Sequence, residues 1–136
     1  KKAEAAGCDA IIAEGFEAGG HNGREETTTL VLLPLVCDAV KIPVIAAGGI
    51  ATGRQMLACM RLGAEGVQMG SRFVASEEAS SHSNFKNAVI SANEGDTKVT
   101  LKELTPVRMI KNDFYEKISQ AQKDHASVEQ LQQILV

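Results

Sequence analysis

The chain has few aromatic residues and no excess of positive charge. Of its 136 residues 4% are aromatic, none is tryptophan, and the formal net charge at pH 7 is -3. Nucleic-acid-binding domains usually carry basic patches, and no basic stripe with interleaved aromatic residues occurs here. No apolar run approaches the ~20 residues of a membrane-spanning helix, and no signal peptide opens the sequence. We therefore expect a cytoplasmic protein with no nucleic-acid or membrane partner.

Cysteine and histidine are also sparse, and neither follows a metal-binding pattern. Cys8, Cys37 and Cys59 are far apart and include no CxxC pair, and no two histidines have HxxxH spacing. A free cysteine packs as a small hydrophobic residue. We therefore expect no metal site and three reduced, buried thiols.

Three short apolar runs, each followed by a glycine turn and a helical pattern, make up most of the chain. The predicted strands are 9–14, 44–47 and 65–69, and the predicted helices are 29–40, 53–62 and 83–92. Near-continuous apolar strands that alternate with helices favour a parallel sheet buried on both faces. Pro34 removes an amide within the first helical pattern, so we expect the regular helix to begin near Leu33. The predicted class is α/β.

Repeated βα units are typical of a (β/α)8, or TIM, barrel. We assign residues 1–92 to the C-terminal units of such a barrel, about strands 6–8 of the eight. A closed barrel needs ~200–250 residues, and three strands alone would leave two apolar edges open to water. The first residues have no initiator Met and resemble the end of a helix. We therefore expect about five further βα units before Lys1.

The pattern changes after residue 92. We assign residues 93–136 to a mainly helical segment that follows the barrel, with a strand at 97–101 and helices at 113–122 and 127–135. Asp113 and Ser127 are the expected N-caps, the latter in a capping box with Gln130.

Two glycine turns stand directly after the second and third predicted strands. Gly48 and Gly49 follow one strand, and Gly70 and Ser71 follow the other. A glycine at this place lets the backbone approach a ligand, and free amides there bind anions. Barrels frequently build a phosphate site from the loops after their last two strands. These residues therefore predict a phosphate site; the alternative is that the glycines only permit tight turns.

A histidine lies in a glycine-rich loop after the first predicted strand. Residues 14–23 read Glu-Gly-Phe-Glu-Ala-Gly-Gly-His-Asn-Gly. The loop follows the carboxyl end of its strand, so it lies at the same edge of the predicted sheet as the glycine turns. Histidine is the side chain whose ordinary pKa lies nearest to neutral pH. His21 is therefore the candidate general acid or base; the alternative is an exposed, inert residue. His82 and His125 lie in polar stretches typical of helix surfaces.

The segments 14–21, 42–50 and 66–73 together resemble the last three strand ends of a flavin-dependent barrel superfamily. This superfamily contains nitronate monooxygenase, formerly 2-nitropropane dioxygenase, and the FMN-dependent enoyl-[acyl-carrier-protein] reductase. The resemblance runs from about residue 5 to residue 89, and residues 105–112 also resemble the segment that follows the barrel in these proteins.

The resemblance implies FMN at the top of the barrel, with its phosphate on Gly49, Gly70 and Ser71. His21 matches the functional histidine of the superfamily. The other flavin contacts that the resemblance implies are Glu14, Gly19, Gln68 and Met69, with Gly20 and Gly48 beside matched positions.

The resemblance also implies one of two activities. In the reductase, NAD(P)H reduces FMN and hydride reaches an enoyl thioester; in the monooxygenase, a nitroalkane or nitronate is oxidised with O2. We favour the reductase, because the monooxygenases often have Gln in place of Glu14 and Arg in place of Asn22. The Ala-Glu-Gly opening at 13–15 and the threonine run at 27–29 are also closer to the reductases.

A different class stays open, namely a non-catalytic flavin- or phosphate-binding barrel fragment. The expected partners are a small-molecule or acyl-carrier-protein thioester substrate, the remaining barrel units and, in a homodimer, a second copy of the chain.

Overall fold

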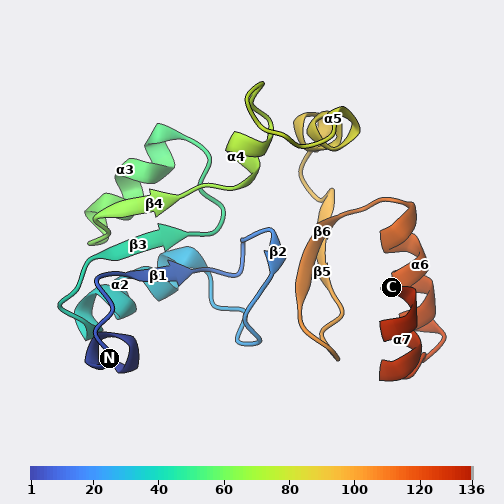
Figure 1. Cartoon of the computed structure of the whole chain (residues 1–136), viewed down its shortest axis with the longest axis horizontal. Coiled ribbons are helices and arrows are strands. Elements are labelled where there is room, and N and C mark those ends of the chain that lie inside the picture. Colours follow the sequence, from blue (N-terminus) through green and yellow to red (C-terminus); the bar gives the residue numbers. More distant parts are fainter. Residues whose placement is uncertain (136) are drawn as a thin grey trace.

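Two three-stranded sheets organise the structure, a computed structural model that describes residues 1–135 (Figure 1). The first sheet is parallel and contains β1 (Ile11–Glu14), β3 (Val44–Ala47) and β4 (Gly66–Gln68) in the order β1-β3-β4. Helices α2 (Thr29–Ala39) and α3 (Gly53–Arg61) pack against this sheet. The predicted α/β class and parallel strands are therefore confirmed.

The second sheet is antiparallel, and only one of its strands was predicted. β5 (Thr97–Thr100) and β6 (Val107–Ile110) form a hairpin, and β2 (Gly20–His21) pairs with β6 in the order β2-β6-β5. The two residues of β2 lie in a glycine-rich loop and have no strand pattern of their own. The segment after residue 92 thus contains a β-hairpin as well as helices.

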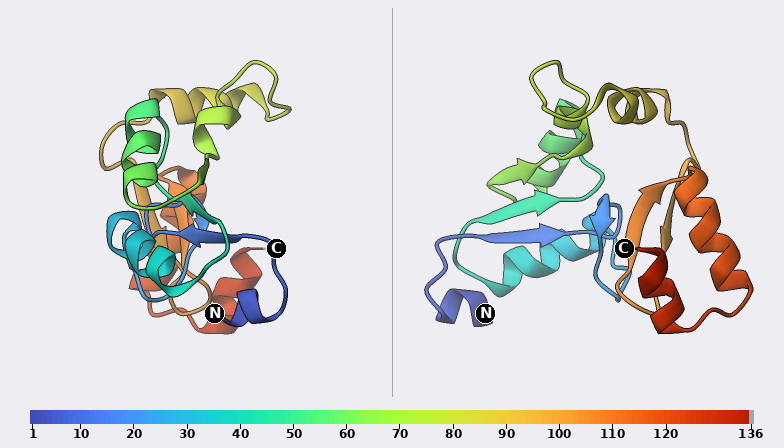
Figure 2. Two further views of the ribbon diagram at one scale, coloured as in Figure 1. Left: turned by 90° about the vertical axis from the view of Figure 1, so that its left-hand side faces the viewer. Right: turned by 45° about the vertical axis from the view of Figure 1, so that its right-hand side comes forward.

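The remaining helices connect and cover the two sheets. They are α1 (Lys2–Ala5), α4 (Ser71–Val74), α5 (Ser83–Ser91), α6 (Asp113–Lys123) and α7 (Val128–Ile134). The chain runs from the parallel sheet through α4 and α5 to the hairpin, and α6 and α7 lie together beside it (Figure 2). Within residues 1–135 no helix has both the length and the apolar character to span a membrane.

Helix α2 begins at Thr29, so the expected start near Leu33 is wrong. Pro34 lies inside the helix. A proline removes one amide donor and crowds the carbonyl one turn earlier, but the first turn here forms regardless. The Leu32 amide donates to the Thr28 carbonyl at 2.9 Å, and hydrogen bonds from outside the helix, described below, hold Thr29.

Of the two predicted N-caps near the C-terminus, one lies one residue earlier than expected and the other is confirmed. Asn112 caps α6, because its side chain accepts a hydrogen bond from the Tyr115 amide at 2.9 Å. The predicted cap, Asp113, is instead the first helical residue, where an acidic side chain still favours the positive end of the helix dipole. For α7 the capping box of Ser127 and Gln130 is confirmed.

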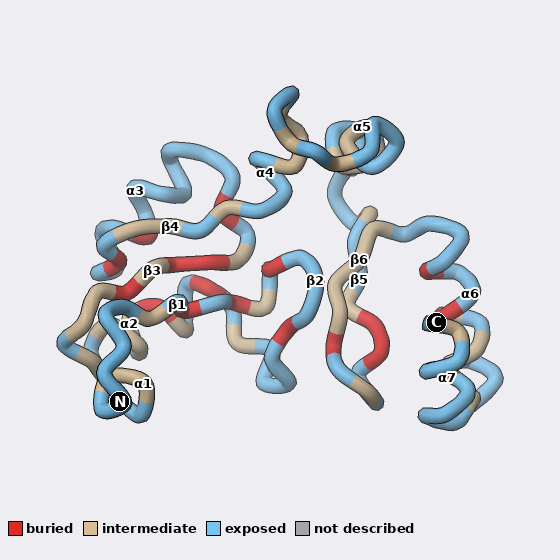
Figure 3. Tube along the Cα trace, viewed as in Figure 1, coloured by how far each residue is buried: buried red, intermediate tan, exposed pale blue. Residues whose placement is uncertain are grey.

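Each part of the chain has its own buried apolar cluster (Figure 3). The first lies at the parallel sheet, α2 and α3, and its buried members are Ala13, Leu33, Val44, Ala46, Ile50, Cys59 and Ala64. The second lies at the hairpin, α6 and α7, and its buried members are Leu101, Ile118 and Leu131. The two clusters fall on either side of residues 92 and 93, where the boundary between the parts stays a prediction.

All three cysteines are free, but only two are shielded from solvent. Burial raises the pKa of the Cys59 thiol. Burial and then the negative charge of Asp38 raise the pKa of Cys37. Cys8 is exposed in the turn between α1 and β1 and Cys37 is half-buried, so the prediction of three buried thiols is wrong for Cys8 and holds in full only for Cys59. A thiol with a raised pKa is a poor nucleophile at neutral pH, so neither Cys37 nor Cys59 is a good candidate for a nucleophile.

The parallel sheet has two edges without a paired strand within residues 1–135. β1 and β4 are its edge strands, with no further strand paired to them within residues 1–135. Ile12 of β1 is 55% exposed, although its neighbour Ala13 belongs to the buried cluster. A parallel sheet of a βα protein is normally covered on both faces and closed or extended at its edges. The sheet therefore has the form of part of a barrel.

Candidate functional site

The register of the parallel sheet places two of the predicted site residues on one face. Glu14 pairs with Ala47, and Ala47 pairs with Gln68. Residues in register on neighbouring strands point to the same face. The adjacent row contains Ala13 and Ala46, which are buried under the helices, so Glu14 and Gln68 lie on the opposite face. Both are exposed, and they mark the end of the sheet at which both glycine turns begin.

The first glycine turn needs glycine for reasons of packing. Gly48 and Gly49 have φ values of +101° and +69°, which side chains rarely adopt. A Cβ at Gly48 would lie 2.7 Å from the Gly15 carbonyl oxygen, and one at Gly49 would lie 2.9 Å from Cβ of Glu17. The tight-turn interpretation thus explains why both positions are glycine. It does not explain the Gly49 amide, which donates to no acceptor within residues 1–135.

The second glycine turn is open. Gly70 has φ -98°, and a Cβ there would meet nothing within 4 Å. Within the described part of the chain the Gly70 and Ser71 amides have no acceptor. A Cβ at Gly19 would lie 4.0 Å from the Ser71 hydroxyl oxygen, so the histidine loop lies beside this turn. The structure therefore brings together the loops that follow all three parallel strands.

Two residues that the sequence analysis missed connect these loops. Glu17 accepts hydrogen bonds from the Thr29 amide at 2.9 and 3.2 Å and so supplies the cap that the Thr28 side chain does not. The Thr29 hydroxyl oxygen lies 2.8 Å from the Gly48 carbonyl oxygen. Thr29 is 6% exposed at the first position of α2. Its burial could not be inferred from the sequence, which shows only a threonine before an apolar helical run.

His21 lies in the antiparallel sheet, where it pairs with Val107. Its exposed side chain lines a cavity of about 380 Å³, which residues from the hairpin and α7 complete. The other lining residues are Leu101, Leu104, Thr105, Val107, Gln132 and Leu135. The segment after the barrel thus takes part in shaping the surroundings of His21, a role that the sequence analysis did not give it.

The other two histidines lie away from this cavity. His82 caps α5 by accepting a hydrogen bond from the Asn84 amide at 3.1 Å, and His125 is exposed just after α6. Among residues 1–135, His, Cys, Asp and Glu form no group that could hold a metal ion.

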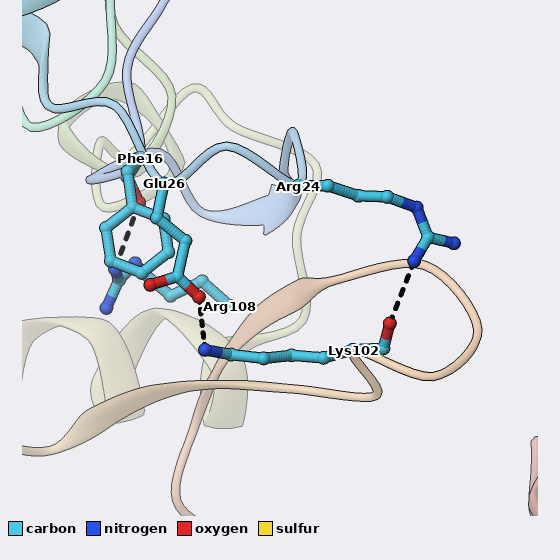
Figure 4. Close-up of polar contacts among 5 residues, drawn as sticks. All are labelled: Phe16, Arg24, Glu26, Lys102 and Arg108. Atoms are coloured by element: carbon cyan, nitrogen blue, oxygen red, sulfur yellow. Dashed lines mark hydrogen bonds and ion pairs between the residues drawn. The ribbon is translucent and has the colours of Figure 1, made fainter.

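Polar contacts fasten the histidine loop to the hairpin (Figure 4). The Arg108 guanidinium donates to the Phe16 carbonyl at 2.9 Å and lies 4.9 Å from the centre of the Phe16 ring. Arg24 donates to the Lys102 carbonyl at 3.1 Å, and Lys102 forms an ion pair with Glu26. These contacts hold both ends of the loop against the hairpin.

We expect Arg108→Met to loosen the loop. The variant loses the charged hydrogen bond to Phe16 and the contact with its ring, which should lower the free energy of unfolding by about 1–3 kcal/mol. The exposed bond after Arg24 should also become more sensitive to trypsin. Lys98→Met is the matched control, because the Lys98 side chain is exposed on neighbouring β5 and forms no hydrogen bond or ion pair within residues 1–135. Equal cleavage of wild type and Arg108→Met would contradict the fastening role.

The chain is similar to proteins of known family. The family model described as nitronate monooxygenase matches residues 1–135. A probable nitronate monooxygenase of Staphylococcus saprophyticus is 44% identical over 128 residues, which cover 86% of this chain and 36% of that protein.

Two solved structures are similar in fold as well as in sequence. FabK from Thermotoga maritima is 50% identical with a TM-score of 0.84, over 90% of this chain and 39% of FabK. A nitroalkane oxidase from Streptomyces ansochromogenes is 37% identical with a TM-score of 0.75, over 85% of this chain and 36% of that enzyme. The chain spans less than two fifths of the length of each of these relatives. From its match over residues 1–135, the chain belongs to the nitronate monooxygenase family.

Proposed function

We propose that this chain contributes the phosphate end of a flavin mononucleotide (FMN) site to an oxidoreductase. The observation that carries the proposal is the pair of glycine turns, whose amides at Gly49, Gly70 and Ser71 have no acceptor within the described residues. The turns follow the neighbouring strands β3 and β4, and space is open at Gly70. Unpaired amides beside a hydroxyl suit a phosphate group. The residues present therefore fit this part of FMN.

The remaining predicted site residues have separate parts in this proposal. FMN, when bound, supplies a group that accepts and donates electrons. Glu14 and Gln68 would contact it from the helix-free face of the sheet. The Met69 side chain packs against the first buried cluster, so Met69 would take part through its backbone. Gly19 and Gly20 would let the histidine loop approach it, and Gly48 would shape the first turn. His21 would give or take a proton on the substrate.

For the reaction we favour enoyl-[acyl-carrier-protein] reduction with NAD(P)H as the co-substrate. The identity of 50% to FabK, against 37% to the nitroalkane oxidase, supports this choice. Asn22 supports it as well. Its side chain is 7% exposed and donates to the Ala18 and Gly20 carbonyls at 2.9 and 3.1 Å. The larger Arg of many monooxygenases would not fit in that position without a different loop.

Nitronate oxidation with O2 is the second candidate. It is favoured by the description of the matching family model and by the names of the curated relatives. In this reaction His21 would take a proton from the nitroalkane.

Two assays on the whole protein, purified with its flavin, separate these functions. We expect anaerobic oxidation of NAD(P)H that depends on a crotonyl thioester, because a reductase needs no oxygen. Oxygen uptake that depends on a nitronate, without thioester reduction, would instead support the monooxygenase. A flavin spectrum without either activity would support a binding protein. A preparation that binds no FMN even after reconstitution would contradict the flavin site itself.

A further inference from the structure

A buried hydroxyl contacts the peptide group on which the first glycine turn depends. The Thr29 hydroxyl oxygen lies 2.8 Å from the Gly48 carbonyl oxygen and 3.0 Å from Oε2 of Glu17. It carries a single hydrogen, which it donates to one of these two oxygens or to the Ala47 carbonyl oxygen at 3.4 Å. The Thr29 amide donates to the Glu17 carboxylate, so the threonine is fixed at the start of α2 from two sides.

The geometry of the peptide group links Thr29 to the Gly49 amide. The Gly48 carbonyl and the Gly49 N–H belong to one planar, trans peptide group, so they point in opposite directions. With the carbonyl directed at Thr29, the N–H of Gly49 is directed away from α2. No residue of the described chain accepts a hydrogen bond from it there.

This peptide group needs an external restraint. Both residues have positive φ and lack a Cβ, and glycine has little intrinsic preference among backbone conformations. Rotation of the peptide group between them would turn the amide toward Thr29 and the carbonyl oxygen toward the opposite side. An oxygen in that position would repel a phosphate. A hydrogen bond donated by the Thr29 hydroxyl to the Gly48 carbonyl stabilises the observed orientation, because rotation of the peptide group would break this bond.

We propose that Thr29 is a positioning residue that directs the Gly49 amide toward the phosphate of FMN, with Glu17 holding Thr29 in place. The inference rests on the proposed flavin site and adds to it a residue that does not touch the cofactor. It predicts an effect on phosphate recognition alone, since the riboflavin part of FMN would contact other residues.

The test compares the affinities of the whole apoprotein for FMN and for riboflavin, which lacks the phosphate. Wild type should prefer FMN. In Thr29→Val, which keeps the shape but removes the hydroxyl, the preference for FMN should fall about tenfold, while the affinity for riboflavin stays within about threefold. Thr29→Ser should restore the preference. Thr28→Val is the matched control, because Thr28 is exposed and its side chain makes no cap hydrogen bond.

The outcomes separate the inference from the proposed function. An unchanged preference for FMN in Thr29→Val, or an equal loss of both affinities, would overturn the role of Thr29 and leave the flavin site intact. A wild-type protein without any preference for FMN would contradict the phosphate site, and with it this inference. If Thr29→Val does not fold, Thr29→Ala gives the same comparison with a smaller side chain in the buried position.

Discussion

Replacing Gly15 by alanine should prevent the βα unit of β1 and α2 from forming. A Cβ at Gly15 would lie 2.2 Å from the hydroxyl oxygen, 2.5 Å from the amide nitrogen and 2.6 Å from Cα of Thr29. Two of these atoms are backbone, so no side-chain rotation relieves the collision. The helix would have to move away from the sheet, where Leu33 is 1% exposed.

The expected loss of folding stability is large for the addition of one methyl group. Overpacking of a rigid core costs about 1–3 kcal/mol, and we expect more here because the collision is with backbone. Denaturant unfolding of the whole protein, or its recovery in the soluble fraction, measures the effect. Gly53→Ala is the matched control, since a Cβ at the first residue of α3 meets nothing within 4 Å and alanine favours helix. Wild-type stability of Gly15→Ala would contradict the described contact between β1 and α2.

Replacing His21 by alanine should lower turnover by about 10²–10⁴-fold, the range for loss of a general acid or base. Flavin content should stay near that of wild type, because the pairing of β2 with β6 uses backbone groups, which alanine retains. Steady-state kinetics and the flavin absorbance of the same preparation measure both quantities.

The pH dependence gives the second readout for His21. If the imidazole transfers a proton, the variant should also lose one limb of the pH–rate profile. His125→Asn is the control, since His125 is exposed, lies away from the cavity and has φ +56°, which asparagine tolerates. Unchanged turnover in His21→Ala, or a loss of flavin in proportion to the loss of activity, would refute the proton-transfer role.

Local patterns were sufficient for the elements that form the barrel segment. β1, β3 and β4 are short apolar runs next to glycine or proline, and the turns after them were predicted from the same residues. Helix α2 began earlier than expected, because the hydrogen bonds of Thr29 to Glu17 outweigh the local effect of Pro34.

Strand pairings and hydrogen bonds between residues far apart in the sequence could not be predicted. β2 is a strand only because β6 lies beside it, and the fastening of Phe16 by Arg108 joins residues 92 positions apart. The residue types predicted that Gly49 and Ser71 follow strand ends, whereas the proposed orientation of the Gly49 amide depends on the Thr29 hydroxyl of helix α2. The roles of the predicted site residues stay predictions until the variants are measured.

The fastening of the histidine loop also sets an order of events during synthesis. The three described strands of the parallel sheet and helices α2 and α3 have all been synthesised once β4 has emerged, but within residues 1–135 β2 has no partner until β6 has been translated. The contact between Phe16 and Arg108 spans 92 residues, which corresponds to roughly 5–20 s of elongation at 5–20 residues per second. During that interval the nascent chain has its glycine turns but no fixed place for His21. The glycine turns proposed for the phosphate are therefore translated before β6, the strand that positions His21, the residue proposed for proton transfer.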